Sequence, residues 1–363
     1  SALEDLIVES GMVAADVQIL IEVGGYLAER DPHTPTAVAC FSAPSDEELG
    51  VVRELLRARA PIIPIARHTE RFEDFPEPLQ HLNGAKLAED EDKWSNTAAA
   101  VLESVGLLRS QRRLFVSYRR TESRDAAVQL HDQLSERGFQ VFLDTHAIRP
   151  GKVFQDQLWH SLCDSDVMVM LDTKTYFERK WTREEFGRAQ SMGINILRLV
   201  FPSHTPDATL ELSEQRVLTE SDFDNQFLKE DVLEDIVYKI ERLRARGMAA
   251  RHTEMTGKLK SGIEAAGGSL DGAGAYRSVS IRLNDGGRVW AYPIIGVPTA
   301  NLMQDIARHA ALANQEGPYL VYDRTGISPE WLEHLMWLDE TIGDVDFMSV
   351  SDAADILAKR KAP

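Results

Sequence analysis

Cysteine is scarce in this chain. Of its 363 residues only Cys40 and Cys163 are cysteines, the first in an apolar run and the second at the end of an expected helix. Two thiols leave almost no material for a disulfide framework or for a cysteine-based zinc site. We therefore expect both to be buried small side chains, and we expect no metal site.

Long apolar runs and an excess of positive charge are missing as well. No stretch approaches the ~20 residues that a membrane span needs, and Ser1 to Asp5 lack the basic-then-apolar pattern of a signal peptide. With 40 Lys and Arg against 58 Asp and Glu, the net charge is −18, which disfavours general nucleic-acid binding but leaves room for a local basic patch. We expect a cytoplasmic protein without a membrane partner.

Several catalytic motifs are also absent. The sequence has no G-x-x-x-x-G-K-[ST] phosphate loop, no G-x-G-x-x-G after a strand, no H-E-x-x-H and no G-x-S-x-G. Nothing therefore supports ATP hydrolysis, hydride transfer, metalloprotease or serine hydrolase chemistry. What is present is an ordinary globular composition, with 43% hydrophobic and 27% charged residues, and a length that predicts two or three domains.

Two junctions divide the chain into three segments. R-S-Q-R-R at 109–113 follows a helical stretch, and a charged helix over 231–246 runs into a second junction at 244–256, which precedes a glycine-rich stretch at 262–274. We expect domains at 1–108, 109–250 and 255–363. Each segment alternates strand and helix patterns, so the predicted class is α/β throughout.

The middle segment has buried strands separated by amphipathic helices. Its strands are expected at 113–118, 139–144, 166–171 and 194–200, and its helices at 125–137, 153–163 and 182–192. Continuous Val, Ile, Leu and Met character indicates strands buried on both faces, which favours a parallel sheet covered by helices. Functional loops in such sheets follow the carboxyl ends of the strands.

The third segment opens on a predicted hairpin, 278–283 and 288–295, around the tight-turn sequence Asn284 to Gly287. Two αβ steps follow, with helices at 299–314 and 329–342 and strands at 319–322 and 345–350. Pro298 and Thr299 are typical of a helix start, where capping is favoured over anion binding. Trp331 and Trp337 lie among Leu and Met residues, which favours a core or an interface.

Three motifs of the middle segment occur in the order and spacing of one family. They are F-V-S-Y-R-R at 115–120, L-D-T-H-A-I-R-P-G at 143–151 and S-D-V-M-V-M-L-D-T-K-T-Y-F-E-R-K-W-T-R-E-E at 165–185. As a set they resemble the signatures of a TIR (Toll/interleukin-1 receptor) domain. The resemblance implies a flavodoxin-like parallel sheet, here flanked by two further α/β domains, and one of two activities: assembly of signalling scaffolds or cleavage of the nicotinamide–ribose bond of NAD+.

In the NAD-cleaving members a glutamate four residues after a tryptophan carries the chemistry, and the resemblance assigns this role to Glu185, after Trp181, rather than to Glu184. One helical turn separates the pair, so both side chains should share a face. The carboxylate would stabilise the oxocarbenium-like ribose as nicotinamide leaves, with Trp181 as a wall of the cleft. The alternatives are a solvated glutamate paired with Arg183 or Arg188, and a tryptophan that anchors the helix in the core.

Other candidates follow the first strand. Arg119 and Arg120 could hold the pyrophosphate or the adenosine phosphate, or could form a solvated pair beside Glu122. Ser117 and Tyr118 would shape the adenine or ribose pocket.

The second strand leads into a predicted assembly loop. Asp144 is expected to close the strand and orient this loop rather than to act as a second catalytic acid. The resemblance implies that the loop mediates assembly and gates the cleft; its named members are His146, Ile148, Arg149, Pro150 and Gly151.

The first segment repeats part of this pattern, with an apolar strand at 37–41, a helix at 47–58 and a strand at 62–65. Aligning Glu54 with Glu185 places Gly50 where Trp181 stands. This predicts a degenerate TIR-like domain with a structural Glu54, although convergence of two ordinary αβ units explains the pattern as well.

Our interpretation is an NAD+ glycohydrolase or ADP-ribose cyclase that uses Glu185, with NAD+ as substrate and no bound cofactor. The resemblance implies self-association through TIR domains and a role in bacterial immune (anti-phage) or cell-death signalling. An activating protein or small-molecule ligand could bind a flanking domain. The alternative is a non-enzymatic scaffold that binds other TIR domains through the 145–152 loop.

Overall fold

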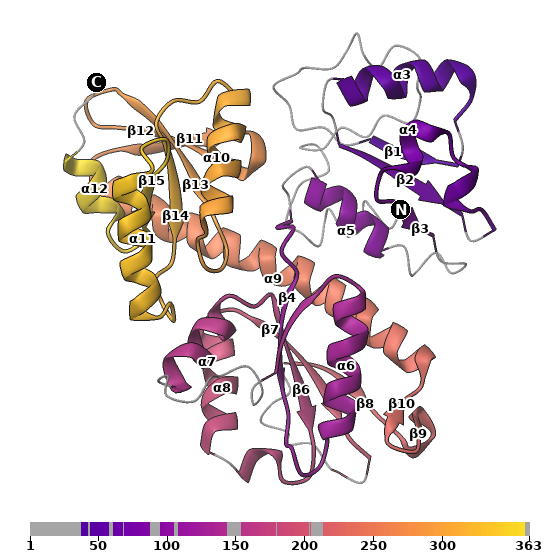
Figure 1. The fold of residues 1–363 in the computed structure, drawn as a ribbon. Helices are drawn as coiled ribbons and strands as arrows, with labels where there is room; N and C mark the ends of the chain where they lie inside the picture. The colour runs from indigo at the N-terminus through magenta and orange to yellow at the C-terminus, as the bar shows by residue number, and fades with distance from the viewer. Residues whose placement is uncertain are drawn as a thin grey trace.

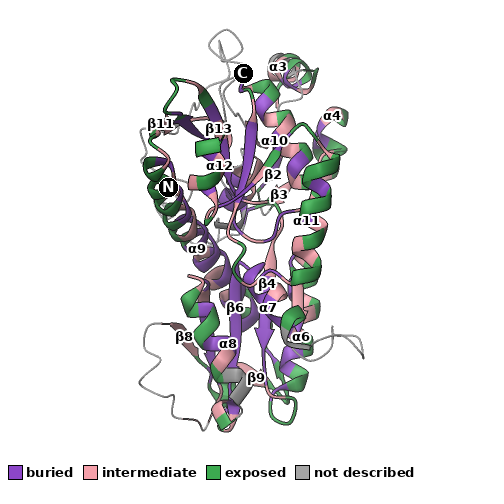
Figure 2. Cartoon of the chain, turned by 90° about the vertical axis from the view of Figure 1, so that its left-hand side faces the viewer, coloured by how far each residue is buried: buried purple, intermediate pink, exposed green. Residues whose placement is uncertain are grey.

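The structure is a computed structural model of the chain that describes residues 38–42, 44–57, 61–67, 69–87, 95–104, 108–143, 154–178, 180–202, 204 and 213–359. Three α/β bodies are arranged around one long helix (Figure 1). Buried residues run along the central strands, and exposed residues lie on the outer faces of the helices (Figure 2). Among the described residues, no helix combines the length and apolar character that crossing a bilayer would need.

The middle body contains a five-stranded parallel sheet. Its strands are β4 (Arg113–Ser117), β5 (Gln140–Leu143), β6 (Val167–Asp172), β7 (Asn195–Val200) and β8 (Glu214–Val217). They are arranged in the order β5-β4-β6-β7-β8, and every neighbouring pair is parallel. This is the 2-1-3-4-5 order of the flavodoxin-like fold, as expected. The fifth strand, β8, was not predicted.

Helices cover both faces of this sheet (Figure 1). Strands send alternate side chains to opposite faces, so Leu114 and Val116 pack with α6 (Arg124–Glu136), whereas Phe115 packs with α7 (Phe154–Cys163) and α8 (Lys180–Ser191). Gly138, with φ +83°, follows the end of α6, as its place after the expected helix predicts. Ser117 is two residues after Phe115, so its side chain lies on the same face and is directed towards α8.

The junction expected at 244–256 is not a break. A single helix, α9 (Glu230–Ala265), runs through it and joins the middle body to the third. Gly247, which lies within the expected junction, has a packing role, because a Cβ there would lie 3.0 Å from the side-chain nitrogen of Asn195 on β7. Glycine thus permits close contact of α9 with the sheet, and the helix tolerates its modest cost.

The third body is a five-stranded mixed sheet in the order β11-β12-β13-β14-β15. The hairpin of β12 (Val279–Arg282) and β13 (Arg288–Pro293) is confirmed, and β14 (Pro318–Tyr322) and β15 (Asp346–Ser349) continue it in parallel. The unpredicted edge strand is β11 (Ser269–Ala273), in the glycine-rich stretch. The helices are α10 (Ala300–Leu312), α11 (Pro329–Thr341) and α12 (Ala353–Lys359).

Two sequence expectations about this body can be checked directly. Thr299 caps α10 by accepting a hydrogen bond from the amide of Leu302, so the predicted helix start is confirmed. The two tryptophans differ: Trp331 is half-buried and donates to the carbonyl of Pro298, whereas Trp337 is 57% exposed.

The first body contains a parallel sheet of β1 (Val38–Phe41), β2 (Ile62–Ala66) and β3 (Ala85–Lys86), with α3 (Asp46–Arg57) and α4 (Glu77–Gln80) packed on it. Its last helix, α5 (Ser95–Ser104), packs against α9 as well as against β3 of this sheet. Of the two cysteines, Cys163 is buried as expected, but Cys40 is only half-buried.

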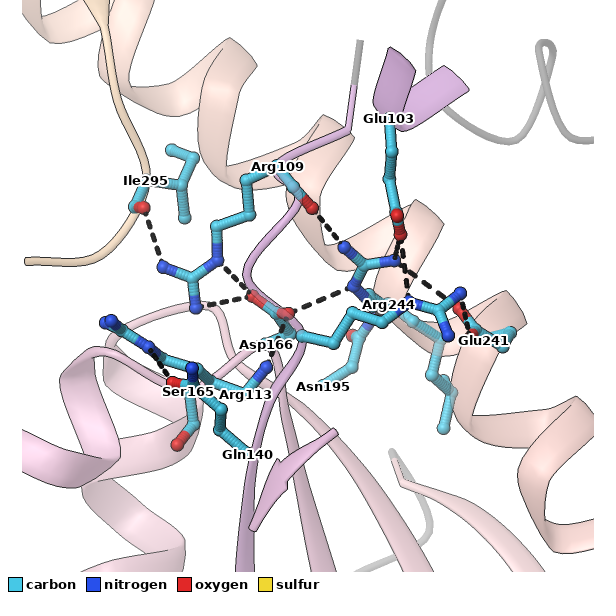
Figure 3. Close-up of polar contacts among 12 residues, drawn as sticks. Glu103, Arg109, Arg113, Gln140, Ser165, Asp166, Asn195, Glu241, Arg244 and Ile295 are labelled. Carbon is cyan, nitrogen blue, oxygen red and sulfur yellow. Dashed lines mark hydrogen bonds and ion pairs between the residues drawn. The ribbon is translucent and has the colours of Figure 1, made fainter. Parts of the chain in front are cut away.

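The three bodies meet at the amino end of the middle sheet, in a buried network of charged groups (Figure 3). Asp166 lies just before β6, and its carboxylate accepts from Nε of Arg109 at 2.7 Å and from Nε of Arg244 at 3.0 Å. Arg109 also donates to the carbonyl of Ile295 in the third body, and Arg244 pairs with Glu103 of α5 at 2.6 Å. Asp166 thus contacts Arg109, which precedes β4, and Arg244 of α9. Through these two arginines it is connected to both flanking bodies.

Candidate active site

The candidate site lies where the strand order of the middle sheet reverses. The second strand in chain order, β5, lies beside β4 on one side, and β6 lies on the other. Loops that leave neighbouring strands in opposite directions open a crevice at their carboxyl ends, where ligands of such folds bind. Ser117 ends β4 and Asp172 ends β6, so the residues that follow both strands line this position.

Glu185 reaches this position from α8. Its Oε2 accepts a hydrogen bond from the Ser117 hydroxyl at 2.6 Å, and the residue is only 1% exposed. The solvated alternative is therefore wrong for this carboxylate. Arg188, one of the partners considered for it, stacks its guanidinium 4.1 Å from the ring centroid of Trp159, and Arg183 is exposed.

A tyrosine that sequence reasoning missed completes this contact. Tyr176 begins the short helix η4 (Tyr176–Glu178) after β6, and its hydroxyl donates to the Ser117 oxygen at 2.6 Å. Both residues are fully buried. Tyr176 directly follows Lys174 and Thr175, a local sequence with no distinctive motif, so its position beside β4 could be found only from the fold.

Arg119 lies at the rim of the same region. Its guanidinium donates to the carbonyl of Thr175 and lies 3.5 Å from the carboxylate of Glu178. Arg120 is exposed. The two loops are joined again by Glu122, whose carboxylate accepts from the Thr175 hydroxyl at 2.6 Å.

The ionised form of Glu122 is favoured in this position. Partial burial raises its pKa, but hydrogen bonds from Thr173 and Thr175 outweigh burial and hold the pKa below its usual value. A negative charge therefore remains at the rim next to Arg119.

Some predicted site residues fall outside the described residues. They are Asp144, His146, Ile148, Arg149, Pro150 and Gly151. Trp181 belongs to α8 by its backbone, one turn before Glu185, but its side chain is not described. Tyr118 is buried and packs on the α6 face of the sheet, opposite to the face where Ser117 meets Glu185.

A second buried polar cluster lies beside the site at the carboxyl ends of β6 and β7. Arg198 donates from Nε to Asp172 at 2.7 Å, and Nε2 of His204 lies 3.1 Å from the other oxygen of the same carboxylate. Arg198 and Asp172 are buried. A single arginine inside the apolar strand I-L-R-L-V was a signal for such a buried partner, although the sequence reading passed over it.

The first body gives a useful contrast. Glu54, aligned with Glu185 by the sequence, is exposed on α3, and Gly50 has open space where a side chain would begin. The described part of this body therefore does not bury a glutamate as the middle body does.

Comparison with known protein families supports the fold described for the middle body. A family model described as TIR domain matches residues 114–234, which include all five strands of the parallel sheet and the first turn of α9. No curated protein matched the chain. The sheet order, the motifs after β4 and β6 and the family match lead to the same conclusion: residues 114–234 form a TIR domain, which lies between two further α/β bodies.

Proposed function

We propose that the TIR domain cleaves the nicotinamide–ribose bond of NAD+ with Glu185 as the essential carboxylate. The observation that carries the proposal is the position of this side chain. Its carboxylate lies at the switch point of the sheet, the usual ligand position in this fold, and is hydrogen-bonded by Ser117. The pair of Trp181 and Glu185, one helical turn apart on α8, also supports the enzyme, since a scaffold does not need this pair.

The chemistry asks little of the protein beyond a well-placed negative charge. As the bond between ribose C1′ and the nicotinamide nitrogen breaks, its electron pair leaves with nicotinamide, and positive charge develops on the ribose. A carboxylate beside this centre stabilises the transition state more than the ground state. Water then adds to C1′ and loses a proton to give ADP-ribose, or a nitrogen of the adenine adds to give a cyclic product.

The remaining predicted residues have supporting roles in this proposal. Arg119 and Arg120 follow β4 on the rim and would contact the pyrophosphate. Trp181 would bound the nicotinamide side, Ser117 and Tyr118 would shape the pocket, and Asp144 would orient the assembly loop. NAD+ is a substrate here, so the proposal needs no resident cofactor.

Access to Glu185 has to change before NAD+ can bind. A residue that is 1% exposed cannot contact a ribose in the conformation described here. We therefore expect activity to depend on self-association through TIR domains, with residues 145–152 as the assembly loop, and on activation through a flanking body. An immune or cell-death response fits an enzyme that rests in this way.

Burial of Glu185 also favours a second candidate function. In a non-enzymatic TIR scaffold the carboxylate would only fix α8 against β4, and the domain would act through contacts with other TIR domains. The two candidates differ in one respect, because only the enzyme needs the charge of Glu185 during turnover.

Nicotinamide release distinguishes them. Purified protein at high concentration, with and without a crowding agent, is incubated with NAD+, and the products are separated by chromatography. We expect nicotinamide with ADP-ribose or its cyclic isomer from the wild type, and at least a 100-fold lower rate from Glu185→Gln, which keeps the shape and removes the charge. Glu184→Gln on the same helix is the matched control. Equal, measurable rates for wild type and Glu185→Gln would show that Glu185 is not the essential carboxylate, whereas no product from the wild type would favour the scaffold.

A further inference from the structure

A chain of two buried hydroxyls leads to Glu185. Tyr176 donates to Ser117 at 2.6 Å, and Ser117 donates to Oε2 of Glu185 at 2.6 Å. The three residues come from different elements, η4, β4 and α8, which the fold brings together on one face of the sheet. None of the three is more than 1% exposed.

The direction of this chain follows from proton counting. A serine hydroxyl has one proton to donate, and its oxygen accepts through its lone pairs. Because the Ser117 oxygen accepts the tyrosine proton, its own proton is directed elsewhere, and the geometry gives it Glu185 as acceptor. Hydrogen bonds in series polarise one another, so the tyrosine strengthens the bond that the serine makes to the carboxylate.

Packing holds Tyr176, the first donor of this hydrogen-bonded series, in place. The backbone amide of Tyr176 donates to the carbonyl of Thr173 at 3.0 Å, and its ring lies edge-on to Phe177 with centroids 4.9 Å apart. Phe177 in turn lies edge-on to Phe186, the neighbour of Glu185 on α8. Aromatic contacts thus join η4 to α8 and limit the rotamers available to Tyr176.

We propose that Tyr176 is a positioning residue of the active site, acting through Ser117 to hold the carboxylate of Glu185 in its catalytic orientation and in its ionised form. This inference rests on the proposed function. Ser117 thereby gains a specific role: its hydroxyl serves the carboxylate, and its contribution to a substrate pocket is made through Glu185. A glutamate that loses this donor is held less firmly, and its protonated form is disfavoured less.

The test is a double-mutant cycle on NAD+ cleavage. We expect Tyr176→Phe to lower kcat roughly five- to tenfold with little change in KM, since it weakens a hydrogen bond without removing a substrate contact. Ser117→Ala should lower kcat by roughly 10- to 100-fold. In the double variant the loss should equal that of Ser117→Ala alone, because the tyrosine acts only through the serine.

The pH profile of kcat gives a readout that a structural defect would not move. In Tyr176→Phe the acid limb should shift to higher pH, since a carboxylate with a weaker donor takes up a proton more readily. Tyr292→Phe is the control: it removes another buried tyrosine hydroxyl, which donates to Gln315 in the third body, and should leave kcat and its acid limb unchanged. Urea midpoints of the two tyrosine variants show whether folding losses are comparable.

If the wild type is active, three results would contradict the positioning role of Tyr176: an unchanged kcat in Tyr176→Phe, losses that multiply in the double variant, or an acid limb that stays in place. A wild type that releases no nicotinamide would instead overturn the proposed function, and with it the positioning role of Tyr176.

Discussion

Two buried carboxylates of the TIR sheet, Asp166 at the amino end and Glu185 at the carboxyl end, are held in different ways. At the amino end, Asp166 binds the guanidinium groups of Arg109 and Arg244, and the contacts extend to both flanking bodies. At the carboxyl end, Ser117 and Tyr176 hold Glu185 through uncharged hydroxyls. The Asp166 network therefore joins segments through ion pairs, as the Arg198–Asp172 pair does beside the site, whereas the contacts of Ser117 and Tyr176 with Glu185 are made by neutral groups.

The cost of removing charge should differ accordingly. A buried ion pair contributes little net stability compared with a well-packed apolar pair, but breaking one partner leaves buried charge without compensation. A buried carboxylate held by hydroxyls can be replaced by an amide of the same shape at small cost. The following predictions test this contrast, from the largest expected effect to the smallest.

Asp166→Asn should be the most destabilising of these changes. Arg109 and Arg244 would keep their buried positions and lose the carboxylate that faces both, which we expect to cost about 3–5 kcal/mol in the free energy of unfolding. Urea denaturation measures this loss. Asp305→Asn, which breaks an exposed pair with Arg308, should change the same quantity by under about 1 kcal/mol. Equal effects of the two variants would contradict the importance of the amino-end network.

Acid sensitivity should also come from the α9 side of the molecule. Burial, together with the charge of Arg277, lowers the pKa of His252 to about 4, well below the ~6.5 of an unfolded histidine. The unfolded chain thus binds more protons between these values, so the contribution is present above pH ~6.5 and is lost as the pH falls towards 4. Its upper limit, reached above pH ~6.5, is about 3 kcal/mol in the free energy of unfolding.

His252→Gln tests this directly. Stability measured by urea denaturation at a series of pH values should fall less steeply between pH ~6.5 and 4 in the variant than in the wild type. A variant with the same slope as the wild type would show that His252 does not titrate with a lowered pKa.

A pair of glycines measures how closely the third body approaches the amino end. Gly296 has φ +92°, and a Cβ there would lie against Nη1 of Arg109 and 2.6 Å from the carboxylate of Asp164. Gly286 has a similar φ, +86°, with open space around it. In both alanine variants, backbone strain should lower the free energy of unfolding by about 1 kcal/mol. In Gly296→Ala the clash should lower it by about 1–2 kcal/mol more. Equal thermal shifts would contradict the close approach.

Apolar strands and the helices between them could be predicted from the sequence, because burial on both faces leaves a continuous signal. β4, β5, β6 and β7 were found in this way, and the motifs after them identified the family. The edge strand β8, with the sequence E-Q-R-V, gave no such signal, since one edge and part of its surface meet solvent. Strand β11, S-L-D-G-A, lies in a glycine-rich stretch and has no continuous apolar run to predict it.

Tertiary contacts account for the other differences. A junction was expected at 244–256, but α9 runs through it, and Gly247 allows this helix to lie against Asn195 on β7. Glu185 was found from its spacing to Trp181, whereas Tyr176 and Arg198 act through partners on other strands that no local pattern names. Spacing along one helix can be read from a sequence; pairing across a sheet requires the fold.

The central claim is that Glu185, at the carboxyl end of the sheet, holds its charge for chemistry rather than for stability. The most direct measurement is nicotinamide release from NAD+ by Glu185→Gln and wild type at equal concentrations of folded protein. We predict that the variant loses at least 100-fold in rate while its free energy of unfolding stays within about 1 kcal/mol of the wild type. A variant that is strongly destabilised yet releases nicotinamide at the wild-type rate per folded chain would contradict the claim.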